Sequence, residues 1–199
     1  MRIGIISDTH DDIENVQKAI EIFNTEKVQY VIHAGDYIFP GIVSEFKKLD
    51  AKLIGVFGNN DGERVHLLKN FLSIEGELKG ELGEIELDGL RFGVYHGTDK
   101  EVKEKLVNSQ KYDVIISGHT HRIEMPSMAQ KSSSGEKNKD RDEKQHENKR
   151  NATRRQQTPL VLNPGSAHKK VDSLSGAFKE GGLIIFDTGT EEYKFVNLP

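Results

Sequence analysis

Side chains that can bind metal ions recur directly after the predicted strands of this sequence. Apolar runs that read as strands are followed within a few residues by acidic, imidazole or amide side chains, often beside a glycine. Sites in open α/β sheets gather at the carboxyl ends of strands, so we expect these side chains to converge. The candidate metal ligands are Asp8, His10, Asp36, Asn59, His96, His119 and His121.

The spacing within two of these segments favours a shared site. In an extended segment, residues i and i+2 point the same way, roughly 6.6 Å apart. Asp8 with His10, and His119 with His121, are therefore each expected to present two ligands together. No single segment is specific for metal binding. Residues 59–62, for example, are by themselves typical of a turn. The coincidence of several such segments is what indicates a metal centre.

The composition narrows the classes of protein. The 199 residues include no cysteine, so disulfides, thiolate metal sites and cysteine nucleophiles are excluded. No apolar run approaches the roughly 20 residues of a membrane span, and the first residues lead straight into a strand rather than a signal peptide. There is no glycine-rich phosphate loop of the nucleotide-triphosphatase type. We therefore expect a cytoplasmic protein with no membrane partner.

The predicted elements alternate between strand and helix. Residues 13, 16, 20 and 23 are apolar at helical spacing behind Asp11 and Asp12, either of which is a candidate N-cap. Asp88-Gly89 predicts a hairpin turn. Val102, Leu106 and Val107 are expected on the buried face of a later helix. Strands are predicted at 3–6, 28–33, 53–57, 85–87, 90–95, 114–117, 160–162, 182–186 and 193–196, and helices at 13–23, 40–49, 63–71 and 100–108. The βαβαβ opening followed by hairpins fits a two-sheet α/β sandwich.

Residues 127–158 differ from the rest of the chain. They contain nine basic and five acidic residues, and Met128, Ala129 and Ala152 are their only apolar side chains. Such a segment buries too little surface to offset its ordering entropy. Strand-like residues resume at Leu160, so we predict one domain over residues 1–199, interrupted by a flexible polar insertion at 127–158.

The motifs, taken in order, resemble those of a known family. The motifs are Asp8-x-His10, Gly35-Asp36, Gly58-Asn59, His96 and Gly118-His119-x-His121. As a set they are similar to the motifs of calcineurin-like metallophosphoesterases. The short chain and residues 163–166 look most like the compact bacterial and archaeal phosphodiesterase branch, which is itself similar to the retromer scaffold subunit.

This resemblance implies a two-sheet αββα sandwich with two divalent metal ions. Carried over by motif, Asp8, His10 and His121 would hold the first ion. Asn59, His96 and His119 would hold the second, and Asp36 would bridge the two.

The implied activity is hydrolysis of a small phosphodiester by in-line attack of a metal-bound hydroxide at a dinuclear site. Four imidazoles with oxygen ligands favour manganese, iron, cobalt, nickel or zinc over magnesium. Many family members carry a histidine after the ligand asparagine, where this chain has Asn60, which has no proton to give to a leaving group. The lack of a proton donor at this position favours diesters or esters with activated leaving groups as substrates. Asn60 and Asp61 are candidates for supporting the metal ligands.

Two alternative functions remain open from the sequence. A protein-interaction scaffold uses the same fold, but it has no need for seven ligands. A nuclease would use the basic insertion, yet that segment mixes both charges and has no aromatic side chain for stacking on bases. Among other residues, His33 is expected to be structural, and the sequence indicates no particular oligomeric state.

Overall fold

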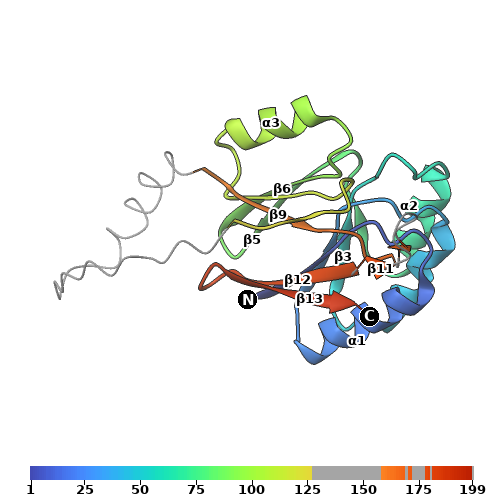
Figure 1. Cartoon of the computed structure of the whole chain (residues 1–199). Coiled ribbons are helices and arrows are strands. Elements are labelled where there is room, and N and C mark those ends of the chain that lie inside the picture. The colour runs from blue at the N-terminus through green and yellow to red at the C-terminus, as the bar shows by residue number, and fades with distance from the viewer. Residues whose placement is uncertain (127–157, 169, 172–177, 180, 199) are drawn as a thin grey trace.

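The computed structural model describes residues 1–126, 158–168, 170–171, 178–179 and 181–198, and two sheets packed face to face form its centre (Figure 1). All but one of the residues of the predicted insertion 127–158, Thr158 excepted, lie outside the described residues. The first sheet has the spatial order β13 (Glu192–Leu198), β12 (Gly181–Asp187), β1 (Arg2–Ile6), β2 (Tyr30–His33), β3 (Lys52–Gly55) and β4 (Glu77–Leu78).

The second sheet combines parallel and antiparallel pairs. Its spatial order is β5 (Leu82–Leu87), β6 (Leu90–Tyr95), β7 (Val114–Ile116), β9 (Leu160–Pro164) and β8 (Ile123–Glu124). The pairs β6–β7 and β7–β9 are parallel, and the predicted hairpin β5–β6 is antiparallel. The short strands β10 (Lys170–Val171) and β11 (Phe178–Lys179) pair separately.

Helices cover the outer faces of the sandwich. On the side of the first sheet lie α1 (Ile13–Thr25), the 3-10 helix η1 (Pro40–Lys48) and α2 (Arg64–Ser73), and α3 (Lys100–Asn108) lies over the second sheet (Figure 1). Asp12 is the N-cap of α1, because its side chain accepts a hydrogen bond from the Asn15 N–H. This arrangement is the predicted two-sheet αββα sandwich. In the described part of the chain, no helix has both the length and the apolar character needed to cross a membrane.

The hydrophobic core has two layers that follow the alternation of the strands. Ile3 and Ile5 of β1 contribute to the layer between the sheets, whereas Ile6 contributes to the layer under the helices. In β12, Ile184 likewise faces the second sheet and Leu183 faces the helices. Buried strands with apolar residues on both faces read as continuous apolar runs, which is why their positions were predictable.

The packing of α3 differs from the sequence prediction. None of its residues is buried, and Val102, expected on its inner face, is 37% exposed. Leu106 and Val107 are half-buried. With three apolar side chains in nine residues, α3 covers the second sheet only loosely.

Candidate metal centre

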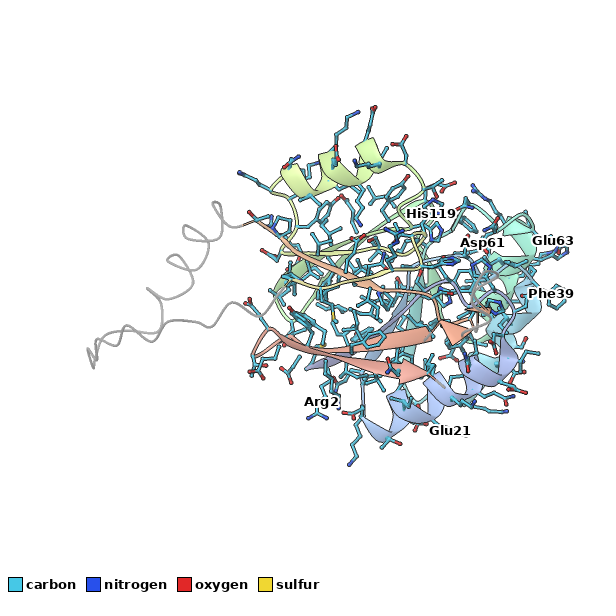
Figure 2. All side chains as sticks on the ribbon, in the orientation of Figure 1. Arg2, Glu21, Phe39, Asp61, Glu63 and His119 are labelled. Carbon is cyan, nitrogen blue, oxygen red and sulfur yellow. The ribbon has the colours of Figure 1, made fainter. Side chains whose placement is uncertain are left out.

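The predicted ligands follow the carboxyl ends of neighbouring parallel strands. Asp8 and His10 follow β1, Asp36 follows β2, Asn59 follows β3, His96 follows β6, and His119 and His121 follow β7. Asp8, Asp36 and His96 are almost completely buried. Figure 2 shows His119 and Asp61 toward the same end of the molecule, which is where these strands end.

A first group of possible ligands consists of Asp8, His10 and His121. The Asp8 Oδ1 atom lies 3.0 Å from His121 Nε2 and 3.7 Å from His10 Nε2. The two imidazole rings meet edge to face with their centroids 5.1 Å apart. These three residues are the set that the family resemblance implies for the first ion.

A second group consists of Asp8, Asp36 and His96, so Asp8 is common to both. The Asp36 Oδ2 atom lies 3.4 Å from His96 Nε2 and 3.6 Å from His10 Nε2. One carboxylate oxygen of Asp36 therefore lies near a ligand of each predicted ion, as a bridging ligand would.

The remaining two predicted ligands, His119 and Asn59, belong to neither group, and only His119 contacts a member of one. The His119 ring packs edge to face on His96, with centroids 5.3 Å apart, and its main-chain N–H donates to Asp8 Oδ2. Asn59 is exposed, and its Oδ1 accepts a hydrogen bond from the Thr98 hydroxyl. The structure thus brings five predicted ligands into the two groups and places His119 against one of them.

Three ligand atoms in the groups are buried and make no hydrogen bond of ordinary geometry, although each lies 3.0–3.6 Å from a ligand atom of another group member. They are Asp8 Oδ1, His10 Nε2 and His96 Nε2. Buried polar atoms are nearly always hydrogen-bonded, since leaving one without a partner costs free energy. Lone pairs of carboxylate and imidazole that point into a common space are what a divalent transition metal requires. The residues present therefore fit a bound cation.

The backbone at these positions is strained. Five predicted ligands have positive φ, namely Asp8 (53°), His10 (42°), Asp36 (61°), His119 (67°) and His121 (54°). Left-handed backbone costs non-glycine residues free energy and persists mainly where function requires it. The extended geometry expected for Asp8–His10 and His119–His121 was therefore wrong, because tight left-handed turns direct these side chains inward instead.

Neighbouring groups fix the orientation of the ligands. The Ser7 hydroxyl donates to Asp8 Oδ2 at 2.6 Å, and His96 Nδ1 lies 2.7 Å from the Ala34 carbonyl oxygen. That contact leaves Nε2 of His96 as the ligand atom. Asn60 donates from its main chain to Asp36 Oδ1 and from its side chain to Asp36 Oδ2.

The same contacts shift the pKa values of the ligands and so set their charges. Burial alone would raise the pKa of Asp8, but contacts with His10, His121 and Ser7 outweigh it and hold the pKa well below its usual value. Burial also acts to raise the pKa of Asp36, yet His96 and Asn60 lower it overall. Burial acts to lower the pKa of His96, and Asp36 and Asp8 raise it overall. Both carboxylates are thus ionised near neutral pH and available to a cation.

Two residues beside the site escaped assignment from sequence. Asn163 donates to the Gly118 carbonyl, and the Ser166 hydroxyl donates to the Asp8 carbonyl. Both support ligand-bearing turns. Their only signal in the sequence was a turn-like segment after a strand. His168 also lies near the site, with its ring 5.8 Å from that of His10.

His33, predicted to be structural, is fully buried and stacks on Tyr37 with ring centroids 3.8 Å apart. Its Nδ1 accepts from the Gly35 N–H, which leaves Nε2 to donate to the Thr9 hydroxyl. Burial lowers its pKa to about 3. His33 therefore stays neutral. Its ring nitrogens contact the turn that carries Asp8 and His10, through Thr9, and the turn that carries Asp36, through Gly35.

Comparison with known proteins places these observations in a family. The profile of the calcineurin-like phosphoesterase superfamily domain matches residues 1–189. A phosphodiesterase of Methanocaldococcus jannaschii is 46% identical over 122 residues, which cover 61% of this chain and 74% of the relative. A probable metallophosphoesterase of Methanothermobacter thermautotrophicus is 35% identical over 130 residues, covering 61% and 67%.

Solved structures agree with this likeness. An archaeal phosphodiesterase of 36% identity superposes with a TM-score of 0.75 and full coverage of both chains. Vps29 from Entamoeba histolytica, at 18% identity, has a TM-score of 0.58 with full coverage and shares the fold. The motif order, the αββα sandwich and these relatives agree: the chain belongs to the calcineurin-like phosphoesterase superfamily.

Proposed function

We propose that this protein is a divalent-metal-dependent phosphodiesterase that hydrolyses a small phosphodiester at a dinuclear site. Asp8, His10 and His121 hold one ion in this proposal, Asn59, His96 and His119 hold the other, and Asp36 bridges them. The observation that carries the proposal is the pair of ligand groups joined through buried carboxylates, with ligand atoms that lack a hydrogen-bond partner.

The ligands and their neighbours determine the charge of this site and the orientation of its metal-binding side chains. When bound, the two ions supply a water nucleophile and neutralise charge on the phosphate. Asp8 and Asp36 offset about half of the four positive charges, so a site near +2 attracts an anionic ester. Asn60 holds both oxygens of Asp36, and the Ala34 carbonyl holds His96, so the ligands are oriented before substrate arrives.

Two observations support diesters over unactivated monoesters. Asn60 lies beside Asp36 and has no titratable proton for an alkoxide leaving group. The relative from M. jannaschii, 46% identical, is a phosphodiesterase. The nitrogen-rich ligand set favours manganese, iron, cobalt, nickel or zinc as the ions.

The test compares Asp36→Asn with Asp50→Asn, an exposed control with the same chemical change. Each protein is stripped with a chelator and reloaded with manganese or nickel. Bound metal is then measured, together with turnover of bis(p-nitrophenyl) phosphate and p-nitrophenyl phosphate. We expect about two ions per chain and preferred diester turnover in the unmodified protein and in the control. Asp36→Asn should lose both ions and nearly all turnover, and unchanged metal content in that variant would contradict the dinuclear assignment.

A further inference from the structure

Beside the candidate metal centre lies a cavity of about 460 Å³ that is partly open to solvent and is lined by α3 and by the turn that carries His119. It exists because α3 packs loosely, with no buried residue along its length. Val107 and Asn108, near the end of α3, line it, and so does Thr120 of the turn after β7.

The cavity adjoins the predicted ligands. His119 lines it and at the same time packs on His96, a member of the second ligand group. Thr98 also lines it, and its hydroxyl donates to the Oδ1 of Asn59. A group bonded to a phosphate at the metal centre therefore has a space to enter on this side. Figure 2 shows His119 below one end of the helix α3.

The charges that line the cavity compensate one another. Lys103 pairs with Glu124 at 2.6 Å, and Lys100 pairs with Glu104 at 3.6 Å. The Lys103 side chain is only 17% exposed, whereas the Glu124 side chain is 41% exposed, so this pair is partly shielded from solvent. Val107 is the one apolar side chain among the lining residues, but most of the exposed lining surface is carbon, and two threonine hydroxyls, the Asn108 amide and the His119 ring add uncharged polar groups. Both lysines that line the cavity are paired with glutamates, so the cavity offers a second phosphate no unpaired lysine. A neutral organic group with a few polar atoms fits this lining better.

We propose that this cavity binds an organic arm of the phosphodiester, a neutral and mostly apolar group about the size of a nucleoside. The volume lies within the usual range of small-molecule sites and far exceeds the needs of a methyl or ethyl group. This inference rests on the proposed function, because it places the phosphate at the metal centre. It makes Val107, Asn108 and Thr98 determinants of specificity.

The test measures binding, so that it does not depend on turnover. Manganese-loaded protein is titrated calorimetrically with thymidine 5′-monophosphate and with inorganic phosphate. Both probes place one phosphate at the metals, and only the first carries an organic group. We expect the nucleotide to bind at least about tenfold more tightly than phosphate.

Val107→Trp should occupy part of the cavity and reduce that preference to about threefold or less, while the affinity for phosphate and the metal content stay unchanged. Val102→Trp is the matched control, since Val102 lies on the same helix, is exposed and does not line the cavity. Asn108→Trp, at an exposed lining position, serves if the half-buried Val107 does not accept tryptophan.

Equal affinity for both probes in the unmodified protein would overturn the inference. So would a preference that survives both lining variants or falls equally in Val102→Trp. A failure of the proposed function is separate: it appears as absent diester turnover in metal-loaded protein, whatever the binding preference.

Discussion

Asp61 is a single carboxylate that ties two ligand-bearing turns together. Its Oδ1 accepts from the N–H groups of Tyr37 and Ile38, at 2.7 and 2.9 Å. Its Oδ2 accepts from those of Asp36 and Gly58, at 3.0 and 2.7 Å. From the sequence, Asp61 is a candidate for supporting the metal ligands within a turn-like segment, residues 59–62. The structure shows that it holds the turn of Asp36 against the turn before Asn59.

Asp61→Asn is expected to damage both stability and metal binding. An amide replaces one acceptor oxygen by a donor that faces main-chain N–H groups, so we expect a loss of about 2–3 kcal/mol in unfolding free energy. The turn of Asp36 should then move, and manganese affinity should fall at least about tenfold. Denaturant unfolding and metal titration check this, with Asp50→Asn as the exposed control. Unaltered metal affinity in Asp61→Asn would contradict the positioning role.

His33 predicts a particular pH dependence of stability. Its pKa in the folded protein is about 3, against 6.5 for a free histidine. Between these values the unfolded chain takes up a proton that the folded chain does not, so stability falls as pH falls. The contribution is up to about 1.4 kcal/mol per pH unit.

The measurement is denaturant unfolding of the chelator-treated protein between pH 7 and pH 4.5. His33→Gln should flatten the pH dependence, whereas His66→Gln, at an exposed histidine, should leave it nearly unchanged. Equal slopes in the unmodified protein and in His33→Gln would show that His33 takes up its proton in the folded state.

At the level of elements, the sequence predicted the strands and the order of the ligands because both are local. Apolar runs mark the buried strands, and glycine with polar residues marks their ends. The partner strands depend on distant pairing instead: β12 lies antiparallel beside β1, and β4 adds only two residues at the sheet edge. Likewise β8 pairs with β9 through Ile123 with Pro164 and Glu124 with Asn163, across the predicted insertion. Left-handed turns at the ligands were unpredictable, because aspartate and histidine adopt left-handed backbone more often than most residues but still only occasionally.

The close packing around Gly118, in the turn after β7, can be tested by adding a Cβ atom there. A Cβ atom at Gly118 would overlap the Ser7 hydroxyl and lie 2.5 Å from Asp8 Oδ2. Gly118→Ala must therefore displace Asp8 or its turn, at a cost of about 1–3 kcal/mol in unfolding free energy. Metal affinity should fall as well. Gly62→Ala is the matched control because its Cβ meets no atom within 4 Å. The two variants are compared by denaturant unfolding and by metal titration, and equal behaviour would contradict the close contact.

For the molecule as a whole, the described ends of the predicted insertion lie close to each other. Pro126 and Thr158 line the same cavity of about 520 Å³, together with Tyr112 and Phe186. This cavity is distinct from the one beside His119, since the two share no lining residue. A short connection can therefore join the ends, and the cost of closing a loop changes only slowly with its length.

Replacing residues 127–158 by a short glycine-containing turn is expected to preserve folding, metal content and turnover of a small diester within about twofold. Thermal unfolding, metal analysis and a bis(p-nitrophenyl) phosphate assay measure these properties. If metal binding or turnover is lost, the segment has a structural or catalytic role. If only a large polyanion loses affinity, and the loss fades at high salt, the basic residues act as an electrostatic tether.

The left-handed backbone at His10, His119 and His121 also bears on how this protein can evolve. At each position glycine would relieve the strain, and asparagine would reduce it, so the residues that suit the metals are not those that suit the backbone. A library selected for heat resistance alone should drift toward glycine or asparagine there. A library required to retain catalysis should keep the histidines and acquire its stabilising substitutions elsewhere.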